Sequence, residues 1–296
     1  MNKQLSAHLA LLLTNLFFAI NLSAVKFLTN HALAQPFGIN VVRVGVSVIL
    51  FWLLFLLKPV NVKIERKDLG RFLACALTGV AINQLLFLKG LSLTYSIHAA
   101  LLMLIVPILI VISAAIVLKE RISLLRVTGL ASGIAGAIVL ISAHDSAGKA
   151  GNVIWGDALI VINAISYTIF FMLVKPLMLK YNPVVVTRWI FTFGLFMVLP
   201  FGWQEFTEIR WPSFGLTGYI CILLIVFFGT FLAYLFNVYG IKILGASTAG
   251  SYIYTQPFFA AAIAMIFLKE PLQPYKIIAA GLIFTGVYLA NKKSEA

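Results

Sequence analysis

Neutral polar side chains recur at helical spacing inside long apolar stretches of this sequence. Tyr234 and Asn237 follow Thr230 at i+4 and i+7, and Gln256 follows Tyr252 at i+4. An amide is costly in hydrocarbon unless it is paired, so we expect these side chains to face the inside of a helix bundle. They suit an amphipathic or zwitterionic solute, and hydrogen bonding between helices is the alternative. The residues predicted to line a solute cavity are Asn15, Asn83, Asn163, Tyr167, Tyr234, Asn237, Tyr252 and Gln256.

Charged groups are scarce in the same stretches. Arg43 and Arg188 lie a turn or two inside their apolar runs, where they either extend to lipid headgroups or bind a solute carboxylate. His98, near the start of a run, either forms interfacial hydrogen bonds or titrates. Asp157 lies within a turn of the start of another run, and no Asp or Glu lies deeper in any run. Ion-coupled carriers commonly use a buried carboxylate, so the sequence predicts a facilitator or a weakly coupled carrier.

The residue patterns of common enzymes are missing from the sequence. It contains no HExxH motif, no GxSxG motif and no pair of intramembrane aspartates. The 4 histidines lie far apart, and Cys75 and Cys221 stand singly inside apolar runs. We therefore predict no catalytic residue, no metal site and no cofactor. A membrane-embedded enzyme stays a remote alternative.

The elements that must carry these side chains are membrane-spanning helices. Of the 296 residues, 62% are hydrophobic and 10% are charged, whereas a soluble protein has about 25% charged residues. A spanning helix needs about 20 apolar residues, and the runs lack the alternation of a β-barrel. We predict an all-α integral membrane protein whose ten transmembrane helices are His8–Leu28, Phe37–Leu57, Arg71–Leu88, Ile97–Leu118, Leu124–Ser142, Ile154–Val174, Val184–Phe201, Leu216–Val238, Ala246–Leu268 and Tyr275–Ala290.

The positive charge of the chain is placed for membrane topology. The formal charge of +13 lies in short gaps between apolar runs and not on a polar domain. We therefore expect contacts with anionic lipid and no nucleic-acid partner. More Lys and Arg fall on the side of the membrane that holds the N-terminus. The positive-inside rule then predicts a multi-pass protein of the cell (inner or plasma) membrane with both termini in the cytoplasm.

A shift of 150 residues brings the second half of the chain into register with the first. Single matches arise by chance, but a proline, a triplet and several glycines in one register do not. The pairs include Gly79 with Gly229, Gly90 with Gly240, Pro107 with Pro257, Leu118-Lys119-Glu120 with Leu268-Lys269-Glu270, and Gly136 with Gly286. We expect Pro107 and Pro257 to bend their helices and shape the cavity, with a packing kink as the alternative.

The predicted halves, residues 1–145 and 152–292, each contain five helices. Because five is odd, the second half enters the membrane in the opposite orientation. Such inverted repeats are typical of transporters, since two similar halves can open a shared site to either side at similar energy. Duplication for packing alone is the alternative. Gly129 and Gly133 indicate close helix packing, and a monomer or a homodimer remains possible.

The repeat unit also resembles a known family. A glycine, a helix with a central proline, Leu-Lys-Glu and a glycine-rich helix resemble the EamA domain, and the whole chain is similar to ten-helix members of the drug/metabolite transporter superfamily. Pro271 departs from the pattern, because the first half has Arg121 at that position. The resemblance implies a 5+5 inverted repeat with a cavity between the first, third, fourth, sixth, eighth and ninth helices. It implies mobile second and seventh helices, and fifth and tenth helices packed outside.

Members of this family move amino acids, nucleotide sugars, purines, vitamins and drugs, often outward. We therefore expect an exporter or facilitator of small metabolites, such as amino acids or related amphipathic solutes, that works by alternating access. Its partners would be a small-molecule substrate and the lipid bilayer. A flippase for lipids or lipid-linked sugars is the alternative within transport.

Overall fold

The computed structural model describes residues 3–57, 59, 64–106, 108–109, 112–113, 124–142, 152–269 and 273–291. Within these residues the regular structure is helical and contains no strand, which confirms the predicted all-α class. Pro107, Glu120 and Glu270, which the sequence comparison singled out, lie outside the described residues.

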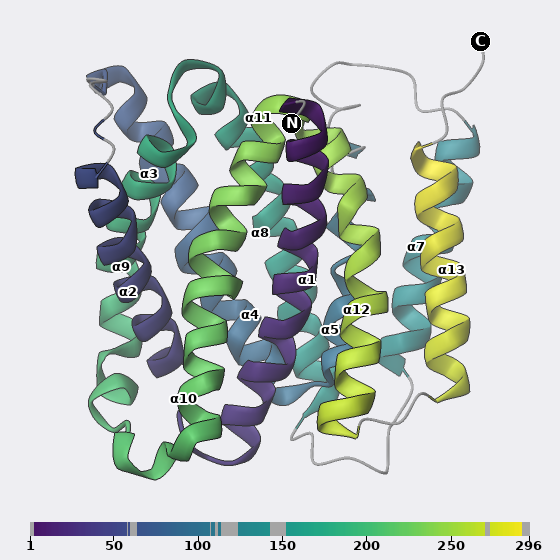
Figure 1. Ribbon diagram of the computed structural model, residues 1–296. Helices are drawn as coiled ribbons and strands as arrows, with labels where there is room; N and C mark the ends of the chain where they lie inside the picture. The colour runs from purple at the N-terminus through teal and green to yellow at the C-terminus, as the bar shows by residue number, and fades with distance from the viewer. Residues whose placement is uncertain are drawn as a thin grey trace.

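The first half contributes two long helices, an interrupted helix and two further segments (Figure 1). The interruption is π-helical and contains Gly79, which matches Gly229 in a second π-helical segment. The elements are α1 (Lys3–Asn30), α2 (Pro36–Leu57), the short 3-10 helix η1 (Arg66–Asp68), α3 (Leu69–Ala76), the π-helical η2 (Leu77–Ala81), α4 (Ile82–Leu93), α5 (Ser96–Leu102) and α7 (Leu124–Ser142).

The second half has the same kinds of element. Near Pro257 the chain changes from α-helix to the 3-10 helix η5, which ends at Thr255, and Pro257 lies in the first turn of the helix that follows. The elements are α8 (Val153–Lys180), α9 (Pro183–Thr207), η3 (Trp211–Phe214), α10 (Gly215–Leu223), the π-helical η4 (Leu224–Leu232), α11 (Ala233–Ser251), η5 (Tyr252–Thr255), α12 (Gln256–Ile263), the π-helical η6 (Ala264–Leu268) and α13 (Pro274–Asn291).

Among the described residues, six helical stretches are long and apolar enough to cross a membrane. They are Lys3–Asn30, Pro36–Leu57, Arg66–Leu93, Val153–Lys180, Pro183–Thr207 and Trp211–Gly245. Tyr252–Leu268 is a shorter apolar helix. The chain is therefore a helical membrane protein, and the arrangement as ten spans stays a prediction.

Polar side chains determine where several helices begin. The Asn152 side chain accepts a hydrogen bond from the first turn of α8, and the Asn182 side chain does the same for α9. At α2 the cap comes from far along the sequence, since a carboxylate oxygen of Glu205 accepts from the backbone N–H groups of Phe37 and Gly38 at 2.6 and 3.0 Å. An anion at this position also interacts favourably with the helix dipole.

Most of the extensive helix contacts join one half of the chain to the other. Helix α1 packs against α11 and α12, α2 against α9, α4 against α8, and α7 against α13. Figure 1 shows α7 and α13 side by side at one edge of the bundle, with α2 and α9 at the opposite edge. The centre is therefore built from helices of both halves.

The glycines of α7 and α13 allow these two helices to approach closely. A methyl group on Gly136 would lie 2.9 Å from the carbonyl oxygen of Ala279, and one on Gly286 would lie 2.5 Å from the backbone nitrogen of Gly133. The two helices therefore meet backbone to backbone. The small residues that the sequence analysis assigned to close packing are used within the chain.

Candidate functional site

A cavity lies among α1, α2, α4, α8 and α11, together with η5 and the start of α12. Its empty volume is about 520 Å³, which includes space that is open to the surroundings. Five of the eight predicted lining residues contact it, namely Asn83, Asn163, Tyr167, Tyr234 and Gln256. The rest of the wall consists of Phe18, Asn21, Arg43, Gln84, Phe87, Met103 and Ile253.

The other three predicted residues lie elsewhere. The Asn15 side chain donates to the carbonyl of Leu11 in its own helix at 2.9 Å. Asn237 lies behind the wall, where its amide donates to the Tyr167 hydroxyl at 2.9 Å. Tyr252 forms a 2.7 Å hydrogen bond with the His8 ring. None of the three is a lining residue of this cavity.

Arg43 is a cationic residue in the wall of this cavity. It is 3% exposed, so it does not extend to the headgroup region. Its Nε donates to the Thr230 hydroxyl at 3.0 Å, and that hydroxyl donates to the carbonyl of Ile225 within the π-helical segment η4. Within the described part of the chain, Nη1 of Arg43 is buried and has no hydrogen-bond partner. The cavity wall therefore holds a positively charged donor group that is incompletely satisfied.

Amide oxygens in the same wall lack donors. The Gln84 amide nitrogen donates to the Tyr234 hydroxyl at 3.1 Å, and the Asn163 amide nitrogen donates to the carbonyl of Asn83 at 2.6 Å. These bonds fix two of the amides. The side-chain oxygens of Asn21, Gln84 and Asn163 are buried without a partner among the described residues. Such groups cost about 1–3 kcal/mol each if nothing binds them.

Sequence reasoning did not select Asn21 or Gln84. Asn21 stands alone between apolar residues of α1, and its isolation in an apolar run was the available signal. Gln84 directly follows Asn83, and adjacent residues of a helix do not face the same direction. Both side chains reach the cavity because it is surrounded by helices on several sides.

Arg188, the counterpart of Arg43 in α9, lies in a different environment. Its guanidinium carbon lies 3.6 Å from the ring centre of Phe55 and 4.5 Å from that of Trp52. Arg188 is 5% exposed and is not a lining residue of the cavity. Cation–π contacts with two residues of α2 therefore hold this side chain.

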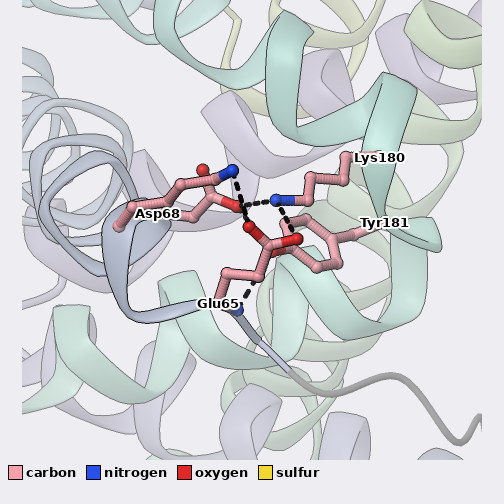
Figure 2. Close-up of polar contacts among 5 residues, drawn as sticks. Glu65, Asp68, Lys180 and Tyr181 are labelled. Atoms are coloured by element: carbon pink, nitrogen blue, oxygen red, sulfur yellow. Dashed lines mark hydrogen bonds and ion pairs between the residues drawn. The ribbon is translucent and has the colours of Figure 1, made fainter.

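An ion-pair network joins the two halves where α8 ends (Figure 2). Lys180 Nζ lies 2.6 Å from a carboxylate oxygen of Glu65 and 2.6 Å from one of Asp68. The Tyr181 hydroxyl donates to Asp68 at 2.5 Å and accepts from the backbone N–H of Glu65 at 3.2 Å. Hydrogen bonds from Lys180, and then from Lys67, lower the pKa of Glu65. The network ties the start of α3 to the turn between α8 and α9.

At the other end of α8, Asp157 lies near the start of the helix, as expected, but its carboxylate is completely buried. The sequence places no Asp or Glu deep in a span, and Asp157 agrees with this. Position near a helix end does not exclude burial here, because Thr94, directly after α4, and His98 of α5 contact the carboxylate.

Comparison with known proteins agrees with this architecture. The model of the EamA-like transporter family matches residues 5–142 and 154–292. A protein of Archaeoglobus fulgidus named as an uncharacterized transporter is 27% identical over 285 residues, which are 96% of this chain and 98% of that protein. A probable terminal-alkyne amino-acid exporter of Streptantibioticus cattleyicolor is 25% identical over 240 residues, 80% of this chain and 78% of that protein.

A solved crystal structure superposes with a TM-score of 0.65 at 18% identity and covers 100% of this chain and 99% of its own. That likeness concerns the fold. The family match covers nearly all of both halves, and the relatives are named as transporters. This chain belongs to the EamA-like transporter family.

Proposed function

We propose that the protein exports amino acids, or closely related zwitterionic metabolites, across the cell membrane by alternating access. The observation that carries this proposal is the pairing of Arg43 with unpartnered amide oxygens in one buried cavity. A guanidinium binds a carboxylate through charge-assisted hydrogen bonds. Amide oxygens accept hydrogen bonds from an ammonium group. The cavity thus offers complements to both charged groups of an amino acid.

Aromatic side chains in the same wall suit the remainder of such a solute. Phe18, Phe87 and Tyr167 line the cavity together with Met103. These groups offer apolar surface and no charge of their own, so they fit a solute with an apolar side chain. The relative named as an amino-acid exporter supports the same class of solute.

Alternating access follows from the proposed 5+5 inverted repeat of residues 1–145 and 152–292. In the proposed repeat α1 corresponds to α8, and α4 corresponds to α11. The contact of α1 with α11 then has its counterpart in the contact of α8 with α4. The cavity lies between these pairs. A tilt of one half against the other would open it at one end and close it at the other.

Counterflow in proteoliposomes tests the proposal. Vesicles loaded with unlabelled amino acid should take up the labelled form, and a panel of amino acids identifies the best solute. Matched analogues test the charge argument: an amine without the carboxylate and an acid without the ammonium group should each compete at least about tenfold less well, since about 1.4 kcal/mol is tenfold in affinity. Empty vesicles are the control.

Two results would contradict the proposal. Equal competition by the analogues would remove the role of the charged groups. Movement of labelled lipid between leaflets without any amino-acid counterflow would favour the flippase alternative.

A further inference from the structure

A buried carboxylate–imidazole pair lies near the end of α1, away from the ion-pair network. His98 Nδ1 is 3.0 Å from a carboxylate oxygen of Asp157, and both side chains are 0% exposed. The Thr94 hydroxyl donates to the other carboxylate oxygen. On the far side of the imidazole, Nε2 lies 3.2 Å from the Tyr275 hydroxyl. The cavity wall includes none of these four residues.

The pair joins elements from both halves of the chain. Thr94 follows α4, His98 lies in α5, Asp157 lies in the second turn of α8, and Tyr275 lies in α13. Gly156 makes this contact possible, because a methyl group there would lie 2.8 Å from the carbonyl oxygen of Gly90 in α4. The backbones of α4 and α8 therefore touch beside the pair.

Two lysines face the same region. Lys26 of α1 donates to the backbone carbonyls of Leu91 and Thr94 at 3.1 and 2.5 Å, so its charge is directed at the C-terminal end of α4. Lys276 of α13 lies 4.7 Å from the ring centre of Tyr95. An imidazole side chain has an unperturbed pKa near physiological pH.

We propose that His98 and Asp157 form a proton-binding site that couples solute export to proton entry. The inference rests on the proposed function for the identity of the solute. One proton binds to the imidazole and forms an ion pair with Asp157, and its loss leaves a neutral imidazole hydrogen-bonded to the carboxylate. The expectation of a facilitator or a weakly coupled carrier rested on the absence of an Asp or Glu deep in any span, whereas Asp157 is buried near a helix end.

Coupling follows from the position of the pair between α5 and α8. Opening this end of the bundle requires these helices to separate, and this separation breaks the contact between His98 and Asp157. The bound proton strengthens the contact, because an ion pair with a charge-assisted hydrogen bond is stronger than a neutral one. Protonation from outside therefore closes this end after the solute leaves. Coupling requires the proton to be released toward the cytoplasm, and this release weakens the contact and allows this end to open again with solute bound.

The first experiment measures coupling in proteoliposomes. A gradient of about one pH unit should drive about tenfold accumulation of labelled amino acid in the opposite direction, for one proton per solute. Asp157→Asn and His98→Gln should abolish accumulation while retaining solute counterflow. His31→Gln is the matched control, because His31 is exposed and bonds only to a carbonyl of its own helix within the described contacts.

The second experiment tests the site without any solute. Nuclear magnetic resonance of the purified protein with 15N-labelled histidine resolves the imidazole signals, and the His98 signal is the one missing from His98→Gln. It should change between the neutral and charged forms of the ring within about pH 5–8, and Asp157→Asn should move that transition.

The outcomes separate the two proposals. Absence of amino-acid counterflow by the wild-type protein overturns the proposed function and leaves the histidine titration to decide the proton site. Counterflow that ignores the pH gradient overturns the coupling. A His98 ring that keeps one protonation state throughout the titration overturns the site itself.

Discussion

Replacement of Arg43 by Gln tests whether the guanidinium binds the solute. Gln keeps a hydrogen-bond donor but loses the charge and the two-pronged geometry that matches a carboxylate. The cavity is buried, with Arg43 at 3% exposure, so water screens the interaction weakly. We therefore expect a large effect on solute affinity rather than a small change typical of a surface charge.

The magnitude follows from the energy of buried charge pairs. Removal of one partner of a buried, hydrogen-bonded pair costs about 2–5 kcal/mol. The amide of Gln recovers about 1 kcal/mol through a neutral hydrogen bond. The expected loss is about 1–4 kcal/mol, which corresponds to about fivefold to several hundredfold in the dissociation constant. The free protein loses the bond from Nε to Thr230 but also loses a buried Nη1 that has no partner among the described residues, so its thermal stability should change little.

Calorimetric titration of the purified protein with its best amino acid measures this loss. Arg188→Gln is the matched control, because Arg188 packs on Phe55 and Trp52 and is not a lining residue of the cavity. Its affinity should stay near the wild-type value. The amine analogue without a carboxylate should bind Arg43→Gln and wild type alike.

Three results would refute the role of Arg43. The first is unchanged affinity in Arg43→Gln, and the second is an equal loss in Arg188→Gln. The third is an equal loss for the amine analogue, since this would assign the effect to a general change in cavity shape.

Further predictions concern the helix contacts. Gly136→Ala should lower the free energy of unfolding by about 1–3 kcal/mol through overpacking against α13, whereas Gly281→Ala should not, because nothing lies within 4 Å of the added methyl group; thermal melts compare the two. Asp68→Asn should speed hydrogen exchange in η1 by up to about fivefold, because it removes the ion pair with Lys180, and an unchanged rate would show that the network does not hold this segment. Since the pKa of Glu65 is lowered from 4.5, its stabilising contribution is complete at neutral pH and is lost only as the pH falls below about 4.5; Glu65→Gln should reduce the acid dependence of the stability of this segment, and the part that remains belongs to Asp68, the other carboxylate paired with Lys180.

The sequence was sufficient for the class and the family because these depend on patterns that tertiary packing does not alter. Long apolar runs require helices in a membrane. The glycines and the proline that recur in both halves resemble the EamA family, and the model of that family matches this chain. Among the described residues six stretches are long and apolar enough to cross a membrane and Tyr252–Leu268 is shorter, so the ten spans stay a prediction.

The residues of the cavity were predicted incompletely, for a geometric reason. A polar side chain in an apolar run faces inward, but the side of the helix on which it lies determines whether it contacts the cavity or a neighbouring helix. Asn237 and Tyr167 illustrate this, since they bond to each other but only Tyr167 lines the cavity. The position of the Arg43 side chain could not be predicted from the local sequence, because its hydrogen-bond partner Thr230 lies in the other half of the chain. The burial of Asp157 could not be predicted from its position near a helix end, because that burial depends on neighbouring helices.

The cross-half pairing of the helices has a consequence for biogenesis. During synthesis α1, α2 and α7 enter the membrane before α11, α9 and α13 exist, although those later helices are their main contacts. Arg43 cannot form its hydrogen bond until Thr230 has been synthesised, and Asp68 cannot pair with Lys180 until that residue has been synthesised. The first half is therefore a set of inserted but unassembled helices until translation ends. Separately expressed halves should each be degraded alone and should persist when they are produced together.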